Sequence, residues 1–464
     1  MTIMKRLFLF VAMLLAMTSC GLRSSAVLFE GTHTGNWYTT GDVSVQDSML
    51  VLSGADARAV LKQGNYTDFE LRMEVRTTPG GEGAVWFHTD KRLNKGYAVA
   101  IQNDLQDSVW WRMTGSLLSV RNLTKNFVRD DQWFAMSIRV EGQAVTVSLD
   151  GQPVVEYIEP AEPYRIRPHT EARLSSGTFA LVSEGPGRIE FRNIEVIVPE
   201  TETWDRSAQL AQALDETTDE FIRLHQADFP VLDYHVHLKG GLTKEVAASQ
   251  SRKWGINYAI APNCGYRFPI ASARKVNAYM DTMQNQPFIF AMQLEGREWQ
   301  RIFSPAVCDR FSYKFTDALT FTDDKGRRTR IWIPQETWVG DDEQAYMEML
   351  LDRICNQILQ EPVDVYVNPC FLPEPLNERF DELWTEERMD RFVEALAKSG
   401  KALEINELYQ IPNKAILLRA KAAGVKFTFG SNNVTPDVSR LPYSLKMMEE
   451  CGLTASDMYK PPRK

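Results

Sequence analysis

The hydrophobic pattern of the chain changes near Pro199, and this change constrains the fold more than any other feature of the sequence. Before Pro199, apolar and polar residues alternate in short runs; in residues 69–76, Phe, Leu, Met and Val share one face and charged residues the other. After Asp228, short β-rich runs alternate with runs of helical period. The 464 residues are therefore expected to form two large domains of different class.

Residues 25–199 are expected to form an all-β domain. Turn sequences such as Pro79-Gly80-Gly81 and Asp150-Gly151 separate the alternating runs, and no helical pattern of comparable length lies between them. Many short strands with regular turns are typical of a two-sheet sandwich, here of jelly-roll type. The predicted strands cover residues 49–53, 69–76, 84–89, 97–102, 134–140, 145–149, 178–182 and 189–198.

Residues 229–464 are expected to form an α/β barrel, and residues 200–228 a helical linker before it. Strand followed by helix, repeated at least six times, predicts parallel strands with crossover helices. A TIM-like barrel, for which seven strands are one option, is the economical arrangement. A hairpin insertion is expected from two strand-like runs, 318–321 and 330–334. The predicted strands are 231–238, 257–261, 288–294, 363–367, 402–405 and 426–429, and the helices 243–254, 270–283, 342–360, 386–399 and 413–423.

Residues 1–20 have the pattern of an export signal. Lys5 and Arg6 precede an apolar stretch of residues 7–17, which is too short to span a bilayer. The following Thr18-Ser19-Cys20 resembles the bacterial lipoprotein box, which implies lipidation of Cys20 and attachment to a membrane of the bacterial cell envelope through a lipid anchor alone. The alternative is an ordinary cleaved signal in which Cys20 has no role.

Composition excludes some partners. Lys and Arg number 52 against 61 Asp and Glu, a net charge of −9, and no basic run occurs, so nucleic acid is not an expected partner. Five further Cys lie in the second half with no CxxC pair, which argues against a disulfide framework. The sequence does not predict an oligomeric state.

The first domain resembles the 3-keto-disaccharide hydrolase family. The resemblance lies in Leu28-Phe29-Glu30-Gly31, Gly96-Tyr97, Gln132-Trp133, Leu149-Asp150-Gly151 and Phe191-Arg192-Asn193-Ile194. It implies a concanavalin-like sandwich and hydrolysis or elimination at the glycosidic bond of 3-oxidised sugars. The family's Glu and Gln on the central strand are replaced by Ala98 and Ala100, which removes the evident carrier of acid–base chemistry.

Four other residues of the sandwich are candidates for function. His88 is the one imidazole on a plausible inner strand, so it is either a catalytic residue or a structural one. Trp86, Trp110 and Trp111 form either a sugar-stacking platform or part of a core.

The barrel carries its own candidates at the ends of the predicted strands, where the chemistry of such barrels is found. His235 and His237 are one residue apart on a strand, so both imidazoles project to the same side and can bind one metal ion. Glu295, the pair Glu404 and Glu407, and Asn432 each follow another predicted strand.

The second domain resembles the PHP family of metal-dependent hydrolases. The His235-Val236-His237 motif is intact, and Glu295 and Glu404 match positions that point into the family's site. Asn263, Asn368 and Asn432 stand where the family has metal-binding or acidic segments. The resemblance therefore implies at most one divalent ion (zinc, manganese or magnesium) held by His235, His237 and Glu295, with Glu404 or Glu407 as base. The alternative is a barrel that keeps the fold without a metal.

Three functions remain open from the sequence. The first is an exported, lipid-anchored hydrolase or lyase acting on a carbohydrate, with catalysis in the barrel and sugar binding, including contacts from Asn432, around it and in the sandwich. The second is a 3-keto-glycoside hydrolase or lyase with its chemistry in the sandwich. The third is a lipoprotein that binds glycans without cleaving them.

Overall fold

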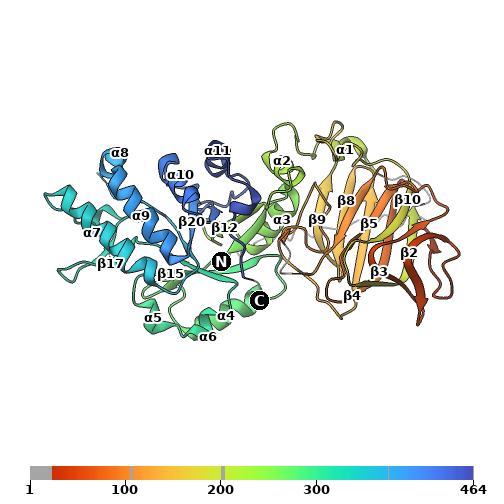
Figure 1. Ribbon diagram of the computed structural model, residues 1–464, viewed down its shortest axis with the longest axis horizontal. Helices are drawn as coiled ribbons and strands as arrows, with labels where there is room; N and C mark the ends of the chain where they lie inside the picture. The colour runs from red at the N-terminus through yellow and green to blue at the C-terminus, as the bar shows by residue number, and fades with distance from the viewer. Residues whose placement is uncertain (1–22, 105–107, 200–203, 375, 463–464) are drawn as a thin grey trace, which may run out of the picture.

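The chain forms two domains that lie side by side, a β-rich one and an α/β one (Figure 1). The computed structural model describes residues 23–104, 108–199, 204–374 and 376–462. The predicted export signal and Cys20 lie outside the described residues. In Figure 1 the β-rich domain is at the right and the α/β domain, coloured green to blue, at the left.

The first domain is an antiparallel sandwich, as the alternating runs predict. Its strands pair in the order β6-β5-β10-β3-β11-β4-β7-β8-β9, while β1 adds to β11 and β2 to β3. The long β3 pairs with β11 through its first half and with β10 through its second half, and so joins the layers. The strands are β1 (Arg23–Val27), β2 (Trp37–Gln46), β3 (Met49–Leu61), β4 (Phe69–Thr77), β5 (Gly83–Thr89), β6 (Tyr97–Ile101), β7 (Phe134–Glu141), β8 (Ala144–Leu149), β9 (Gln152–Ile158), β10 (Thr178–Ser183) and β11 (Arg188–Pro199).

The alternation of β4 shows why these residues form a sandwich. Phe69, Leu71, Met73 and Val75 are buried, while Arg72 on the other face is exposed. Burying one face in this way removes apolar surface from water, which stabilises the fold by about 25 cal/mol per Å² of buried apolar surface. All eight strands expected here are present, and β1, β2 and β9 are additional.

The second domain is a closed barrel of seven parallel strands. The strand order is β13-β12-β21-β20-β19-β16-β15, and β15 pairs with β13 to close the ring; the short β14 extends the sheet beside β15. The strands are β12 (Leu232–Val236), β13 (Asn257–Ile260), β14 (Asn263–Gly265), β15 (Ile289–Glu295), β16 (Tyr313–Thr316), β19 (Val365–Tyr366), β20 (Ala402–Asn406) and β21 (Phe427–Gly430).

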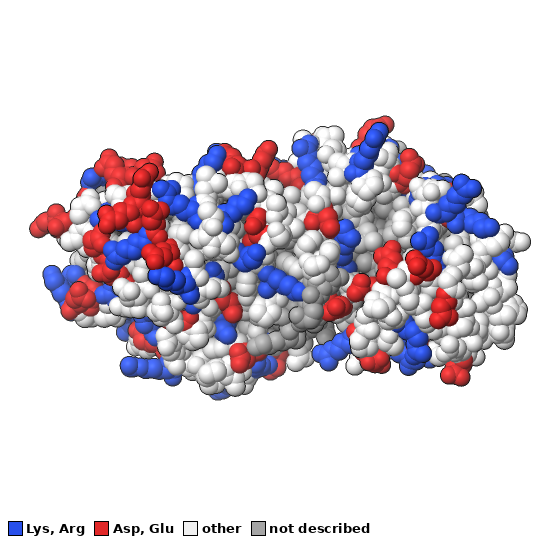
Figure 2. Space-filling model, viewed as in Figure 1, with Lys and Arg blue, Asp and Glu red and all other residues white. Residues whose placement is uncertain are grey.

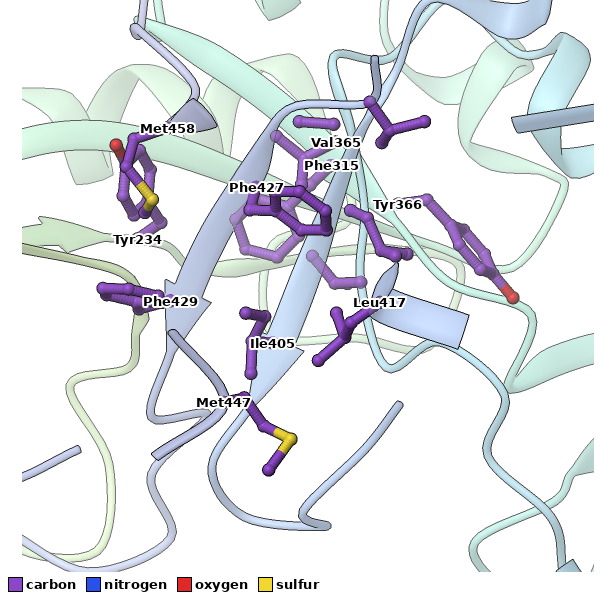
Figure 3. Packing of buried hydrophobic residues seen from close by; sticks show 14 of the residues in the cluster. Tyr234, Phe315, Val365, Tyr366, Ile405, Leu417, Phe427, Phe429, Met447 and Met458 are labelled. Carbon is purple, nitrogen blue, oxygen red and sulfur yellow. The ribbon is translucent and has the colours of Figure 1, made fainter. Parts of the chain in front are cut away.

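Helices follow the barrel strands and pack outside them. Leu417 of α10 and Met447 of α11 lie against the strands that carry Ile405, Phe427 and Phe429 (Figure 3). The helices are α3 (Lys244–Trp254), α4 (Ala273–Met283), α5 (Trp299–Ile302), α6 (Pro305–Cys308), α7 (Glu343–Asn356), α8 (Phe380–Leu383), α9 (Glu386–Ser399), α10 (Lys414–Ala422) and α11 (Pro442–Glu450).

The structure adds several elements to the predicted barrel, among them β14, α5, α6 and α8. Residues 313–316 form a barrel strand, β16, which the sequence reading did not expect, and residues 442–450 form the additional helix α11. The expected hairpin insertion is present as the antiparallel pair β17 (Thr320–Thr322) and β18 (Arg328–Arg330). The insertion thus begins directly after a barrel strand.

The linker and the sandwich cover the amino-terminal ends of the barrel strands. The linker contains the short helices α1 (Arg206–Leu210) and α2 (Glu220–Gln226). Asn257, the first residue of β13, donates to the carbonyl oxygen of Asn122 at 2.9 Å and accepts from the backbone N–H of Thr124 at 3.2 Å. His225 of α2 contacts the carbonyl oxygen of Gly255 at 2.7 Å, just before the same strand.

Gly255 allows this close approach. Its φ is +71°, and a Cβ there would lie 2.6 Å from Cδ of Arg121 in the sandwich. Any other residue would strain the backbone, and its Cβ would displace the side chain of Arg121. The contact is therefore a fitted interface and not a loose tether.

Trp110 and Trp111 are buried in this interface. They are 3% and 6% exposed and belong to the barrel's hydrophobic cluster, and Nε1 of Trp111 donates to Asp228 at 2.8 Å. The expectation of an exposed sugar platform is thus not met at these two positions, because the barrel covers both rings.

Acidic side chains gather at the end of the barrel farthest from the sandwich, with Lys and Arg among them (Figure 2). Many of these charges are paired: Arg388 and Arg391 both contact Glu348 at 2.8 Å, and Arg419 contacts Asp390 at 2.8 Å. This surface is an ion-paired exterior and does not resemble a binding site.

Two further expectations concern cysteines and membranes. The five described cysteines, Cys264, Cys308, Cys355, Cys370 and Cys451, are free and buried. None of the helices in the described part of the chain has the length and apolar character needed to cross a bilayer.

Candidate functional site

Buried polar side chains meet at the carboxyl ends of the barrel strands, opposite the sandwich. β12, β15, β16, β19, β20 and β21 each contribute from their final residues or from the first residues beyond them. All are at most 6% exposed. We call this group the polar centre; its members are His235, His237, Gln293, Glu295, Asp317, Asn368, Glu404, Asn406 and Asn432.

Glu404 holds His235 in one orientation. Its Oε1 lies 2.5 Å from Nδ1 of His235, and its Oε2 accepts from the backbone N–H of Asn368 at 2.7 Å and from Nδ2 of Asn406 at 2.9 Å. The two oxygens of a carboxyl group offer about four acceptor sites, and three of them are used here. Glu404 therefore fixes the orientation of His235.

The two imidazoles of the HxH motif face each other. Nε2 of His235 lies 3.0 Å from Nε2 of His237 and 3.2 Å from Oε1 of Gln293. His237 points its Nδ1 at the carbonyl oxygen of Ala261, 2.6 Å away, so that nitrogen carries the hydrogen and its Nε2 presents a lone pair. A hydrogen on Nε2 of His235 satisfies both of its contacts.

Nδ1 of His235 and Oε1 of Glu404 share one hydrogen, and Nε2 of His235 carries another. His237 stays neutral: burial, and then the charge of His235, hold the pKa of His237 well below its ordinary value. The two rings of the HxH motif are thus held in different hydrogen-bonding roles.

Glu295 and Asp317 form a second, acidic part of the centre. Burial first, and then the negative charge of Asp317, raise the pKa of Glu295 to about 8. Oε1 of Glu295 accepts from Asn263 at 2.8 Å, while its Oε2 is buried and has no hydrogen-bond partner among the described residues. Glu295 therefore carries a proton at neutral pH.

Asp317 is held by its neighbours. Its Oδ2 accepts from Nδ2 of Asn368 at 2.9 Å and its Oδ1 from the backbone N–H of Leu319 at 2.9 Å. Burial raises the pKa of Asp317, while these hydrogen bonds and the charge of His235 oppose the rise. Burial thus raises the pKa of both carboxyl groups of the pair.

The side chains present do not fit a protein-bound metal site. Among the described residues, no three His, Cys, Asp or Glu side chains are arranged to hold a metal ion. Zinc sites use at least three protein ligands, and here Nε2 of His235 contacts His237 and Gln293 instead of a third ligand of that type. The predicted set of His235, His237 and Glu295 is brought into one region but not into one coordination sphere.

The structure also locates the other predicted barrel residues. Asn432 lies in the polar centre, where its Nδ2 donates to Oδ1 of Asn368 at 2.9 Å. Glu407 lies outside the polar centre. It accepts from the backbone N–H groups of Tyr443 and Ser444, at 2.9 and 3.0 Å, at the start of α11. Glu407 therefore caps a helix instead of facing the centre.

His88 of the sandwich is engaged at both ring nitrogens. Nε2 lies 2.9 Å from the carbonyl oxygen of Thr67, and Nδ1 accepts from the backbone N–H of Ser175 at 3.2 Å. Burial lowers the pKa of His88 to about 4, so the ring is neutral at neutral pH. This bonding ties two loops together.

Trp86 lies on the strand face where the resembled family carries polar groups. Its cross-strand neighbours are Ala98 and Ala180, and it is half-buried. Its Nε1 has no hydrogen-bond partner among the described residues. Trp86 remains a candidate for contact with a sugar.

Asp317 was not predicted from the sequence, and Gln293 and Asn406 stand at predicted strand ends but were given no role there. Asp317 follows β16, the strand that was not expected. Gln293 and Asn406 lie two residues from predicted site residues, Glu295 and Glu404, and so project to the same side of their strands. The alternation of side chains along a strand, with a period of two, was the signal that could have identified Gln293 and Asn406.

Comparisons with known proteins concern the sandwich. Residues 24–197 match the family model described as a 3-keto-alpha-glucoside-1,2-lyase-like domain. Among solved structures, a proposed glycosyl hydrolase from Parabacteroides distasonis is similar. The alignment covers 37% of this chain and 92% of that protein, with 16% identity and a TM-score of 0.33. The carbohydrate-binding module CBM66 from Bacillus subtilis is also similar. The alignment covers 34% of this chain and 94% of that module, with 17% identity and a TM-score of 0.26. No curated protein matches the chain.

Proposed function

We propose that the protein is an exported enzyme that cleaves a glycosidic bond, by hydrolysis or elimination, with its chemistry in the polar centre of the barrel. The match of residues 24–197 to a 3-keto-glucoside lyase-like domain supports a carbohydrate substrate. The observation that carries the catalytic assignment is Glu295, a buried carboxyl that keeps its proton at neutral pH and leaves one oxygen without a partner.

Cleavage of a glycosidic bond needs a proton for the departing oxygen and a base for water or for a carbon-bound hydrogen. In this proposal Glu295 donates the proton from its carboxyl group and Asp317 is the base. This proposal requires Asp317 in its ionised form, which the neighbouring His235 favours against the effect of burial, while Glu295 keeps its proton. Glu404, predicted as a base, is instead a positioning residue in this proposal, because its Oε1 contacts Nδ1 of His235 and its Oε2 holds Asn368 and Asn406.

The two domains are placed so that they cannot hold the same sugar ring. The sandwich contacts residues before β12 and β13, whereas the polar centre lies beyond the ends of those strands. A five-residue strand such as β12 spans about 16 Å. The sandwich is therefore proposed to bind another part of a longer glycan or to position the enzyme.

The test measures release of product from disaccharides, in ordinary and 3-keto forms, by the full chain. Glu295→Gln and Asp317→Asn should each lower kcat by about 100- to 10,000-fold, the usual contribution of a general acid or base. Glu404→Gln should lower kcat less and shift the pH profile. Full activity in the Glu295 and Asp317 variants would refute the proposal.

One alternative has an observation in its favour. The family match of residues 24–197 favours chemistry in the sandwich, for which His88 is the titratable candidate. In that case His88→Ala would abolish turnover while Glu295→Gln would not; unchanged turnover in His88→Ala removes the version that depends on this ring. Binding of glycans with no turnover in the wild type would favour the non-catalytic function.

A single zinc, manganese or magnesium ion at His235, His237 and Glu295 stays a prediction that the observed arrangement does not favour. Elemental analysis of the dialysed protein beside a His235→Ala/His237→Ala variant tests it. Metal that is stoichiometric in the wild type and lost in the variant would restore the prediction.

A further inference from the structure

A cleft of about 560 Å³ opens on the barrel face that carries the polar centre. Its walls include the aromatic side chains of Trp332, Phe371 and Tyr409, and its rim includes Glu374 and Gln410. Pockets for small ligands measure about 300–1,000 Å³ and combine apolar walls with a few polar groups. The cleft has the size and lining of a ligand site.

Three neighbouring strands supply both the cleft and the polar centre. β16 is followed by Asp317 and then by the insertion that carries Trp332. β19 is followed by Asn368 and then by Phe371, and β20 ends at Asn406, three residues before Tyr409. Each of the three strand ends therefore places a polar side chain in the centre and an aromatic one in the cleft.

Tyr409 joins the two regions directly. Its backbone N–H donates to Oδ1 of Asn406 at 2.9 Å, and its ring packs edge-on against Phe371 with centroids 4.7 Å apart. Burial, and then the negative charges of Asp317, Glu295 and Glu404, raise the pKa of Tyr409 to about 12. Its phenol thus lies within the field of the acidic groups while its ring lines the cleft.

The lining suits a sugar better than a uniformly apolar ligand. The carbon-bound hydrogens of a pyranose form an apolar face that packs on aromatic rings, and its hydroxyl groups need donors and acceptors at the rim. Trp332 and Tyr409 provide rings, and Glu374, Gln410 and Asn377 provide exposed polar side chains.

Resting on the function proposed above, we propose that this cleft is the sugar-binding subsite of the barrel, with a pyranose ring of the substrate held between Trp332 and Tyr409 and the bond to be cleaved directed at the polar centre. The subsite belongs to the barrel and its insertion. It is separate from the face of the sandwich where a sugar was expected.

The test is a titration of the full chain with sucrose, maltose and cellobiose, and with their 3-keto forms, followed by calorimetry. Trp332→Ala and Tyr409→Ala should each weaken the Kd of the best-bound probe by about tenfold or more, the effect of losing one well-packed aromatic contact. Trp338→Ala is the matched control, because Trp338 belongs to the same insertion, is 40% exposed and does not line the cleft.

Trp332→Phe guards against misfolding, since it keeps a ring at the position and should retain most of the binding. Wild-type affinity in both alanine variants would overturn the subsite, as would failure of the wild type to bind any of the six probes. A sugar bound only by the sandwich gives the first of these results.

The failure of the subsite and the failure of the proposed chemistry give different results. If Glu295→Gln binds the probe and loses turnover while Trp332→Ala binds normally, the subsite is wrong and the chemistry stands. If Trp332→Ala loses binding while Glu295→Gln cleaves at the wild-type rate, the subsite stands and the chemistry is wrong.

Discussion

Replacing Glu404 by Gln should change the hydrogen positions on His235 without dismantling the polar centre. Oε2 of Glu404 accepts from two N–H groups, of Asn368 and Asn406, neither of which can become an acceptor at that atom. The amide oxygen of Gln must therefore take that place, and its NH₂ group must face Nδ1 of His235. His235 can meet this donor only with no hydrogen on Nδ1.

The expected energetic effect is small for this substitution and large for its control. A hydrogen bond to a charged group contributes about 1.5–3 kcal/mol and a neutral one about 0.5–1.5 kcal/mol, so Glu404→Gln should lower the free energy of unfolding by about 1–1.5 kcal/mol. Glu404→Ala leaves three buried donors without an acceptor, at about 1–3 kcal/mol each, and should cost at least about 3 kcal/mol.

Urea titration of the full chain measures both effects, and ¹⁵N spectra of the histidine side chains report where the hydrogens lie. The chain has six His, so the signals can be assigned by substitution. The reasoning is refuted if Glu404→Gln costs as much as Glu404→Ala, or if Nδ1 of His235 keeps its hydrogen in Glu404→Gln.

Three other outcomes are expected. Because the pKa of Glu295 is raised to about 8, kcat/KM should fall as pH rises through that value. The stability that the proton of Glu295 adds to the folded barrel should be lost as pH rises from the ordinary carboxyl range to that same value. Activity and urea midpoints measured against pH for wild type and Glu295→Gln check both predictions, and a flat profile would contradict them. Asn257→Ala leaves two backbone groups of the sandwich without partners and should lower the free energy of unfolding by about 2 kcal/mol or more, against no change for the exposed Asn36→Ala, as thermal unfolding can show. Cys20→Ser should move the protein from the membrane fraction to the soluble one and abolish labelling by a fatty-acid analogue, and an unchanged distribution would count against the anchor.

The sequence predicts the sandwich well because each of its strands has one solvent-exposed face and one buried face. In β4 the buried Phe69, Leu71 and Met73 alternate with polar residues, and this alternation is visible in a single segment. Barrel strands have no such contrast, because both faces are covered. β16 has only four residues and directly precedes the insertion, so its pattern was assigned to the insertion, and Asp317 was missed with it.

The site was predicted in part, for a related reason. His235, His237, Glu295, Glu404 and Asn432 do meet in space, since strand ends of a parallel barrel converge. What each side chain does there depends on partners from other strands, which no single segment reveals.

Two assignments failed because their partners are distant in sequence. Glu407 was expected to act as a base, but it caps α11, a helix that the sequence did not predict. Trp110 and Trp111 looked like a possible sugar platform, and nothing in their own segment indicates that the second domain covers them.

The fitted contact at Gly255 and Asn257 has a consequence for how such a chain can change over evolutionary time. A barrel separated from the sandwich would expose a buried Asn, a neutral buried His and a glycine-lined hollow shaped for Arg121. Exchange of either domain for a relative by recombination would therefore yield a soluble product only if both halves of the junction were inherited together. The junction makes the pair a single unit of inheritance, although each half has the size of an independent domain.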